Sequence, residues 1–418
     1  GIDTKHLLYL PGFIIGIILV ICSNFWGNNF IYYGCILIIA AFVVMFADLR
    51  YYKGFGSVAQ HDGAFKHHLL QQGPKIVVIG GGSGLSTLIR GLKEYTSNIV
   101  AIVTVADDGG GSGKLREEMG ILPPGDIRNC ILAMANTEPE MGKLLNYRFK
   151  DGSLKGQSFG NLFLAAMTDI TGSFEKGVEK MSEVLSVAGK VLPVTLTDVS
   201  LVAELSDGSV VEGESEIPVV SHERHATIRN IYLNPKKPPA YEKTLEAIKE
   251  ADVIVIGPGS LYTSILPNFC VSGISKAVNE SDAVKIYIAN IMTQPGETEC
   301  YDLYDHYDAI RKLGGVEKID YIVANTGNVP DYINEQYNED DAKPVKQKKR
   351  ILTGPKIVFE DFIKLKNGYI RHDENKLAYI VMKLALNNLP KNDHTKVFKY
   401  YYSKSMLMRK KHEEVHNE

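Results

Sequence analysis

Two glycine-rich segments, each directly after a run of apolar and β-branched residues, carry the most chemical information in this chain. The first spans residues 80–86 (GGGSGLS) after the apolar run 75–79, and the second spans residues 106–114 (ADDGGGSGK) after the run 99–105. Glycine allows positive φ angles and a close approach of the backbone to a ligand, and a following helix directs free N–H groups at an anion. The two segments therefore predict loops that hold phosphate groups.

Two carboxylates, Asp107 and Asp108, lie in the second loop, roughly where the acidic residue of a Rossmann fold binds ribose hydroxyls. Alternatively, they hold Mg²⁺ against a pyrophosphate, or Asp108 simply starts an Asx turn. The loop is not a Walker A motif, because Asp108 stands six positions before Lys114 and Leu115 follows where Ser or Thr would bind Mg²⁺. We therefore expect sugar or pyrophosphate recognition without ATP hydrolysis by that route.

Further polar segments follow the predicted strands or begin predicted helices. Residues 257–264 (GPGSLYTS) form a third candidate phosphate loop, and residues 290–298 (NIMTQPGET) end the next strand. Asp126 is expected to cap a helix that carries Asn129 in its first turn, and Asn161 lies at the head of an apolar helix. Polar loops at the ends of apolar strands are what a ligand cleft would produce.

The alternation of strands and helices predicts an α/β fold with a doubly wound, mainly parallel, Rossmann-like sheet. Short β-branched runs at 252–256, 284–289 and 320–324 are typical of strands buried in such a sheet. The segment 191–220 alternates apolar and polar residues and contains an Asp207-Gly208 turn, so we expect a small antiparallel β insertion there. The carboxyl ends of parallel strands form the edge where such folds bind nucleotides.

Composition excludes several classes of protein. The chain has 418 residues, a formal net charge of −3 and 45% hydrophobic residues, so it can bury a large core and has no basic field for nucleic acid. Its five cysteines are scattered, which argues against a disulfide framework and a structural zinc site.

Two apolar segments near the start, residues 7–22 and 30–47, are close to the length that a membrane helix needs. Basic residues flank the pair, with Lys5 before it and Arg50 after it, which predicts a hairpin over 1–50 with both ends in the cytoplasm. A buried helical hairpin is the alternative. We expect a linker over 51–73, one domain over 74–390 and a charged tail over 391–418.

Several segments together resemble the YvcK gluconeogenesis-factor family of bacteria, which is similar to CofD, the 2-phospho-L-lactate transferase of coenzyme F420 synthesis. The resemblance extends from about residue 74 to residue 389. It rests on residues 75–90, 104–116, 123–129, 159–161, 257–262 and 293–298.

This resemblance implies a protein that binds UDP-N-acetylglucosamine and supports cell shape and cell-wall synthesis during gluconeogenic growth. It also implies that Tyr337 and Arg371 complete the pocket; a guanidinium can hold a diphosphate and an aromatic ring can stack on uracil or sugar. The expected ligand residues are Gly81, Gly82, Ser83, Gly84, Asp107, Asp108, Gly109, Asn129, Asn161, Gly259, Ser260, Tyr262, Tyr337 and Arg371.

We expect a binding protein rather than an enzyme, with no required cofactor, placed at the cytoplasmic face of the cell membrane by its hairpin. The alternative is a CofD-like transferase that moves a 2-phospho-lactyl-type group from a nucleotide donor to an acceptor hydroxyl, with Asp107 or Asp108 binding Mg²⁺ or the acceptor. A third interpretation, an NAD-dependent oxidoreductase, is supported only by the glycine loop. Further candidate partners are a second copy of the chain and proteins of cell-wall synthesis.

Overall fold

The computed structural model describes residues 70–389 with short gaps, and three residues of the preceding region. The chain divides into two compact units, Gly1–His68 and Leu69–Glu418. Both predicted membrane segments and the charged tail lie outside the described residues, apart from Cys35, Ile38 and Ile39. No helix in the described part of the chain is long and apolar enough to cross a membrane. The gaps after residue 70 are 137–138, 331, 334–336, 338–340, 347–353 and 367.

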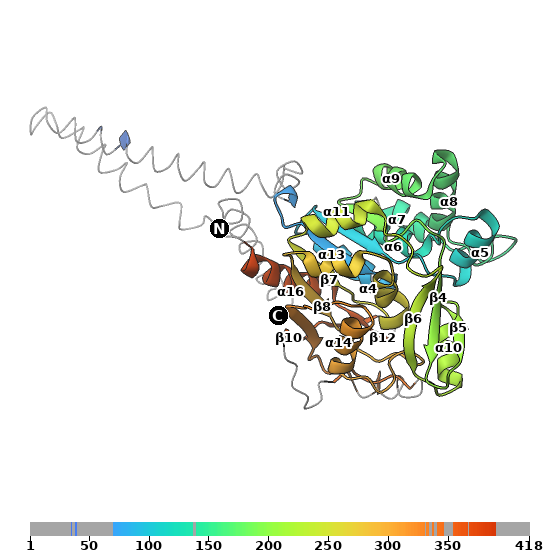
Figure 1. The fold of residues 1–418 in the computed structure, drawn as a ribbon. Coiled ribbons are helices and arrows are strands. Elements are labelled where there is room, and N and C mark those ends of the chain that lie inside the picture. Colours follow the sequence, from blue (N-terminus) through green and yellow to red (C-terminus); the bar gives the residue numbers. More distant parts are fainter. Residues whose placement is uncertain are drawn as a thin grey trace, which may run out of the picture. The chain divides into compact units, whose positions relative to one another are not determined.

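A seven-stranded parallel sheet forms the centre of the second unit (Figure 1). Its strand order is β10-β9-β8-β7-β1-β2-β3, and every neighbouring pair is parallel. The doubly wound α/β prediction is therefore confirmed. The strands are β1 (Ile76–Gly80), β2 (Ile99–Val103), β3 (Lys190–Pro193), β7 (Val253–Ile256), β8 (Val284–Ile288), β9 (Tyr321–Asn325) and β10 (Lys356–Glu360).

The direction of winding reverses between β1 and β7. The chain runs outward from β1 through β2 to β3, and then returns to β7 on the other side of β1 before it continues to β10. Connections between parallel strands are right-handed, so the reversal places helices on both faces of the sheet. It also leaves a crevice at the carboxyl ends of β1 and β7, the usual ligand site of such sheets.

Helices cover the sheet. After β1, α4 packs on α6 and on the late helix α16, while α11 and α13 pack on each other. The helices are α4 (Gly82–Leu92), α5 (Gly110–Met119), α6 (Gly125–Met134), α7 (Pro139–Asn146), α8 (Phe159–Thr171), α9 (Phe174–Val184), α11 (Glu242–Glu250), η2 (Leu261–Ile265), α12 (Leu266–Phe269), α13 (Ile274–Glu280), α14 (Leu303–Lys312) and α16 (Glu374–Asn388).

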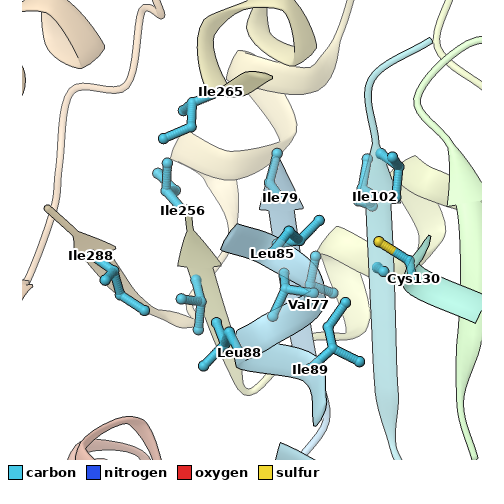
Figure 2. Packing of buried hydrophobic residues seen from close by; sticks show 14 of the residues in the cluster. Val77, Ile79, Leu85, Leu88, Ile89, Ile102, Cys130, Ile256, Ile265 and Ile288 are labelled. Atoms are coloured by element: carbon cyan, nitrogen blue, oxygen red, sulfur yellow. The ribbon is translucent and has the colours of Figure 1, made fainter. Parts of the chain in front are cut away.

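The core explains why β1 is a strand and α4 a helix. All five residues of β1 are buried, as expected of a central strand covered on both faces. Leu85, Leu88 and Ile89 of α4 recur at helical spacing and are fully buried. Figure 2 shows these side chains beside Val77 and Ile79 of β1. This packing fixes the loop between β1 and α4.

A separate antiparallel sheet follows β3, with the order β5-β4-β6. The predicted boundaries of this insertion were wrong, because residues 190–193 pair in parallel with β2 and belong to the main sheet. The run Val191-Leu192-Pro193 is buried throughout, and a buried edge strand of this kind has no alternating pattern. Figure 1 shows the small sheet grouped with helix α10. Its elements are β4 (Ser200–Leu205), β5 (Val210–Glu212), α10 (Glu216–Glu223) and β6 (Ile228–Asn234).

An antiparallel hairpin, β11 (Ile363–Lys366) and β12 (Tyr369–His372), precedes α16. The sequence interpretation included neither this hairpin nor β10. The sequence does carry a local signal for it, because apolar and polar residues alternate over 363–366 and Asn367-Gly368, a pair that favours tight hairpin turns, follows them.

Candidate functional site

The glycine loops after β1 and β7 touch each other at the reversal point. A Cβ atom built on Gly84 would lie 2.7 Å from the carbonyl oxygen of Pro258, and one built on Gly259 would lie 3.3 Å from the carbonyl oxygen of Gly81. A side chain at Gly84 would thus overlap backbone. The absence of a side chain there allows α4 to begin directly beside the β7 loop.

A cavity of about 1060 Å³ is lined by both loops, by the loop after β8 and by the β11-β12 hairpin. Cavities that bind small ligands and cofactors are commonly ~300–1000 Å³, so this one has room for a large ligand. Most of the residues expected to bind the ligand lie in its wall. They are Gly81, Gly82, Ser83, Gly84, Asn129, Gly259, Ser260, Tyr337 and Arg371.

The start of α4 offers amide donors to this cavity. The first N–H groups of a helix have no partner within the helix itself. One of them is occupied, because the Gly82 amide donates a 2.7 Å hydrogen bond to Asp126 Oδ2. The next two amides, those of Ser83 and Gly84, belong to residues of the cavity wall. They are therefore the donors best placed to receive an anion.

The β11-β12 hairpin brings Arg371 to the cavity. The hydroxyl of Tyr337 accepts a 3.1 Å hydrogen bond from the Ile370 amide, which ties the segment around residue 337 to β12. Tyr337 also meets Tyr369 edge to face at 6.4 Å, and the Arg371 guanidinium lies 5.5 Å from the centre of the Tyr369 ring. Two aromatic rings and one guanidinium thus form this wall.

The loop after β8 closes another side, and the antiparallel insertion supports it. Gln294 donates to Ser260 Oγ at 2.7 Å, which connects the β8 loop to the β7 loop. Gly296 has a φ of +74°, and a Cβ on it would lie 1.9 Å from the carbonyl oxygen of Pro218 in α10. Because α10 rests directly on this glycine, the insertion helps to position the cavity wall.

Carboxylates near the ends of the strands hold the starts of helices. The carboxylate of Glu297 accepts hydrogen bonds from the Tyr262 amide at 3.0 Å and from Thr263 Oγ1 at 3.1 Å, at the start of η2. The two oxygens of Asp108 accept the amides of Glu214 and Ser215, at 2.9 and 3.0 Å, just before α10. Negative groups at these positions stabilise a helix through its dipole.

Asp107 starts the Asx turn that the sequence interpretation had considered for Asp108. Its Oδ1 accepts the amide of Gly109 at 3.0 Å. Asp107 and Asp108, the predicted magnesium ligands, therefore accept amides from different segments of backbone. In the described part of the chain, no group of three or more His, Cys, Asp or Glu side chains could hold a metal ion.

Burial, with a further contribution from neighbouring carboxylates at two of them, raises the pKa of three acidic residues in this region. Burial raises the pKa of Asp126 to about 6, and Asp107 adds to the shift. Burial raises the pKa of Glu297 to about 7. Glu214 has a pKa raised to about 8, first by burial and then by neighbouring carboxylates that include Asp107 and Glu297. The folded environment thus favours the protonated form of these carboxyls more than water does.

The remaining expected ligand residues lie outside the cavity wall and have other contacts. Asn161 is buried and accepts a 3.1 Å hydrogen bond from Arg128 Nε, and the Tyr262 hydroxyl bonds the Tyr301 hydroxyl at 2.6 Å. Gly109 precedes α5 and donates to Asp107. Asp107 and Asp108, whose hydrogen bonds are described above, are the other expected ligand residues outside the cavity wall.

Several cavity residues were missing from the sequence interpretation. Arg90 reaches the cavity from α4, and Lys364, His372 and Glu374 reach it from the hairpin and from the start of α16. Burial lowers the pKa of His372 to about 4, and its ring stacks on Phe362. The motif patterns carry no signal for these residues, because they meet only after α16 packs on α4.

Comparison with protein families gives one match that covers most of the chain. The family model described as 2-phospho-L-lactate transferase CofD matches residues 76–362. A relative from Thermoanaerobacterium thermosulfurigenes is 56% identical over 326 residues, which are 76% of this chain and 99% of that protein. The gluconeogenesis factor of Bacillus subtilis is 48% identical over 316 residues, 75% of this chain and 98% of that protein.

A solved structure agrees with the fold. The crystal structure of a UPF0052-family protein from Bacillus halodurans has a TM-score of 0.70 and 45% sequence identity, and the match covers 73% of this chain and 98% of that one. The sheet order and the position of the cavity define a doubly wound α/β protein with a large cavity at the carboxyl ends of its strands, where such folds bind ligands. The chain belongs to the CofD family, in the branch of the gluconeogenesis factors.

Replacing Gly84 with alanine should lower the free energy of unfolding by about 1–3 kcal/mol, because the new methyl group would push the two loops apart. Urea denaturation followed by circular dichroism measures this change. Gly109→Ala is the control, since its Cβ would lie 3.4 Å from the nearest atom and its φ is −79°. Equal stability of Gly84→Ala and the wild type would contradict the tight loop contact.

The acidic cluster should make stability depend on pH. A carboxyl whose pKa is raised on folding binds its proton more tightly in the folded state, so its contribution is full at low pH and is lost as pH rises through the folded pKa. We expect the melting temperature to fall between about pH 5 and 8, and the advantage of Glu214→Gln over the wild type to grow across this range to a few degrees at pH 8.

Differential scanning calorimetry across this pH range measures the effect. Glu216→Gln, at an exposed position two residues along the chain, is the matched control. A Glu214→Gln profile parallel to that of the wild type would show that Glu214 does not titrate in this range.

Proposed function

We propose that this chain binds UDP-N-acetylglucosamine in the cavity at the reversal point and acts as a regulator of cell shape and cell-wall synthesis during gluconeogenic growth. The observation that carries the proposal is the convergence of a helix start and an arginine on one large cavity. Ser83 and Gly84 at the start of α4 and Arg371 on β12 all line it. Donors of this kind recognise phosphate groups.

The other walls suit the rest of a nucleotide sugar. Tyr337 and Tyr369 offer aromatic rings for a uracil or a sugar ring, and Asn129, Asn290 and Gln294 offer amides for sugar hydroxyls. The identity of the sugar comes from the family resemblance. The name gluconeogenesis factor belongs to the Bacillus subtilis relative, which supports the physiological part of the proposal.

Placement at the cytoplasmic face of the membrane is part of the same proposal and rests on the apolar segments 7–22 and 30–47. The hairpin would hold the binding unit near the site of wall assembly. Arg90, Lys364 and Arg371 can supply the positive charge that a diphosphate needs, so the proposed binding does not require a metal ion.

A CofD-like transfer of a 2-phospho-lactyl-type group is the second candidate. The family match and the buried carboxylates of raised pKa beside the β1 loop favour it, since Asp126 bonds the Gly82 amide and has a pKa near 6. A carboxylate with such a pKa can accept a proton from an acceptor hydroxyl. Consumption of a nucleotide donor during incubation would favour this candidate over a binding protein.

Arg371→Ala should weaken the binding of UDP-N-acetylglucosamine by about 10–100-fold, because a charge-assisted pair of hydrogen bonds is lost. Calorimetric titration of the full chain, with and without Mg²⁺ and with NAD and GDP as competitors, measures this. Arg224→Ala is the control, since Arg224 pairs with Asp207 on the insertion and lies outside the cavity wall. Unchanged affinity in Arg371→Ala would contradict the proposed site.

A further inference from the structure

Four charged side chains line the cavity within the described part of the chain, and they come from four different elements. Arg90 belongs to α4, Lys364 to β11, Arg371 to β12 and Glu374 to the first turn of α16. Three are cations and one is a carboxylate, which leaves a net formal charge of two positive. These four residues meet only in the folded unit.

Glu374 lies between two of the cations. Its Oε2 is 3.8 Å from Arg90 Nη1, and its Oε1 is 3.8 Å from Lys364 Nζ. Both distances exceed that of a hydrogen bond, so the carboxylate reduces the positive charge of these cations without occupying their donors. The side chains of Arg90 and Lys364 are 47% and 46% exposed, which leaves them accessible to a ligand.

The position of Glu374 is fixed by the backbone. A Cβ built on Gly91 in α4 would lie 2.1 Å from the Glu374 carbonyl oxygen, so α16 begins in direct contact with α4. Asp373 caps the same helix by accepting the amides of Asn375 and Lys376, each at 2.9 Å. The carboxylate is therefore anchored at the cavity by two independent contacts of its helix.

Arg371 differs from the other two cations. No carboxylate of the described residues lies within 4.0 Å of its guanidinium, which instead lies over the Tyr369 ring. A ligand anion can therefore pair with Arg371 directly. Any additional negative charge of the ligand near Arg90 and Lys364 is repelled by the Glu374 carboxylate.

The diphosphate of a nucleotide sugar joins two sugars and carries about two negative charges. In a nucleotide that ends in a phosphate, the terminal phosphate has a second ionisation with a pKa near 6, so it carries more negative charge at neutral pH. We propose that Glu374 is a specificity-determining residue that matches the charge of the cavity to a diphosphate diester and disfavours nucleotides with a terminal phosphate. This inference rests on the proposed function and adds the basis for choosing among uridine nucleotides. The repulsive element is the Glu374 carboxylate.

The test compares UDP-N-acetylglucosamine with UDP on the wild type and on Glu374→Gln, by calorimetric titration of the full chain at pH 7.5, low salt and no Mg²⁺. We expect the affinity for UDP to rise by about 3–10-fold in Glu374→Gln and the affinity for the nucleotide sugar to change by less. The difference between the two proteins should shrink at 0.5 M salt, because the groups are partly exposed.

Two control variants separate charge from shape. Glu374→Asp keeps the charge and should keep the wild-type preference between the two ligands. Glu360→Gln removes a carboxylate that also lies 3.8 Å from a lysine, Lys383, but outside the cavity wall, and should change neither affinity. Melting temperatures confirm that each variant is folded.

The outcomes distinguish this inference from the proposed function. If the wild type binds the nucleotide sugar and Glu374→Gln shows the same ratio of the two affinities, the role of Glu374 is refuted and the proposed function stands. An equal gain in affinity for both ligands in Glu374→Gln would also refute the role of Glu374. If the wild type binds neither ligand, both proposals are overturned.

Discussion

The contact between the glycine loops after β1 and β7 is the constraint on which the rest of the structure depends. Gly84 lies so close to the Pro258 carbonyl that only a residue without a side chain fits. This contact sets where α4 begins, and the buried face of α4 then sets the position of α16. As a result, the first turn of α4 provides amide donors of the kind that bind phosphate, and Arg90 and the start of α16 reach the same cavity. A small displacement of the two loops would therefore move most of the binding surface.

Negative charge has two separate roles in this unit. Behind the loops, Asp108, Asp126 and Glu297 accept backbone amides at the starts of helices, and burial raises the pKa of the last two. At the cavity, Glu374 adjusts the charge that a ligand meets. The amides that these carboxylates accept offset only part of the cost of burying them, since the pKa values of Asp126 and Glu297 stay raised. The acidic residues near the glycine loop thus act mainly on the fold, while the cations line the cavity proposed to bind the ligand.

The sequence predicted the parallel sheet and the glycine loops well, because buried β-branched runs and loops such as 80–86 are local patterns. It did not predict Arg90 or Lys364 as cavity residues, since their position depends on packing between segments far apart in the chain. Asp108 illustrates the opposite case, because its motif position suggested a ligand role while its two oxygens are engaged by the backbone of the insertion. The boundary of the insertion was wrong for a similar reason, since the pairing of Val191 with β2 depends on tertiary contacts.

The most direct test of the account is a crystal structure of the full chain with UDP-N-acetylglucosamine. We expect the diphosphate to lie between the amides of Ser83 and Gly84 and the guanidinium of Arg371, with one ring of the ligand against Tyr337 or Tyr369. A ligand bound instead beside Asp107 and Glu214, or to a metal held by Asp107, would contradict the assignment of the cavity and would favour a transferase.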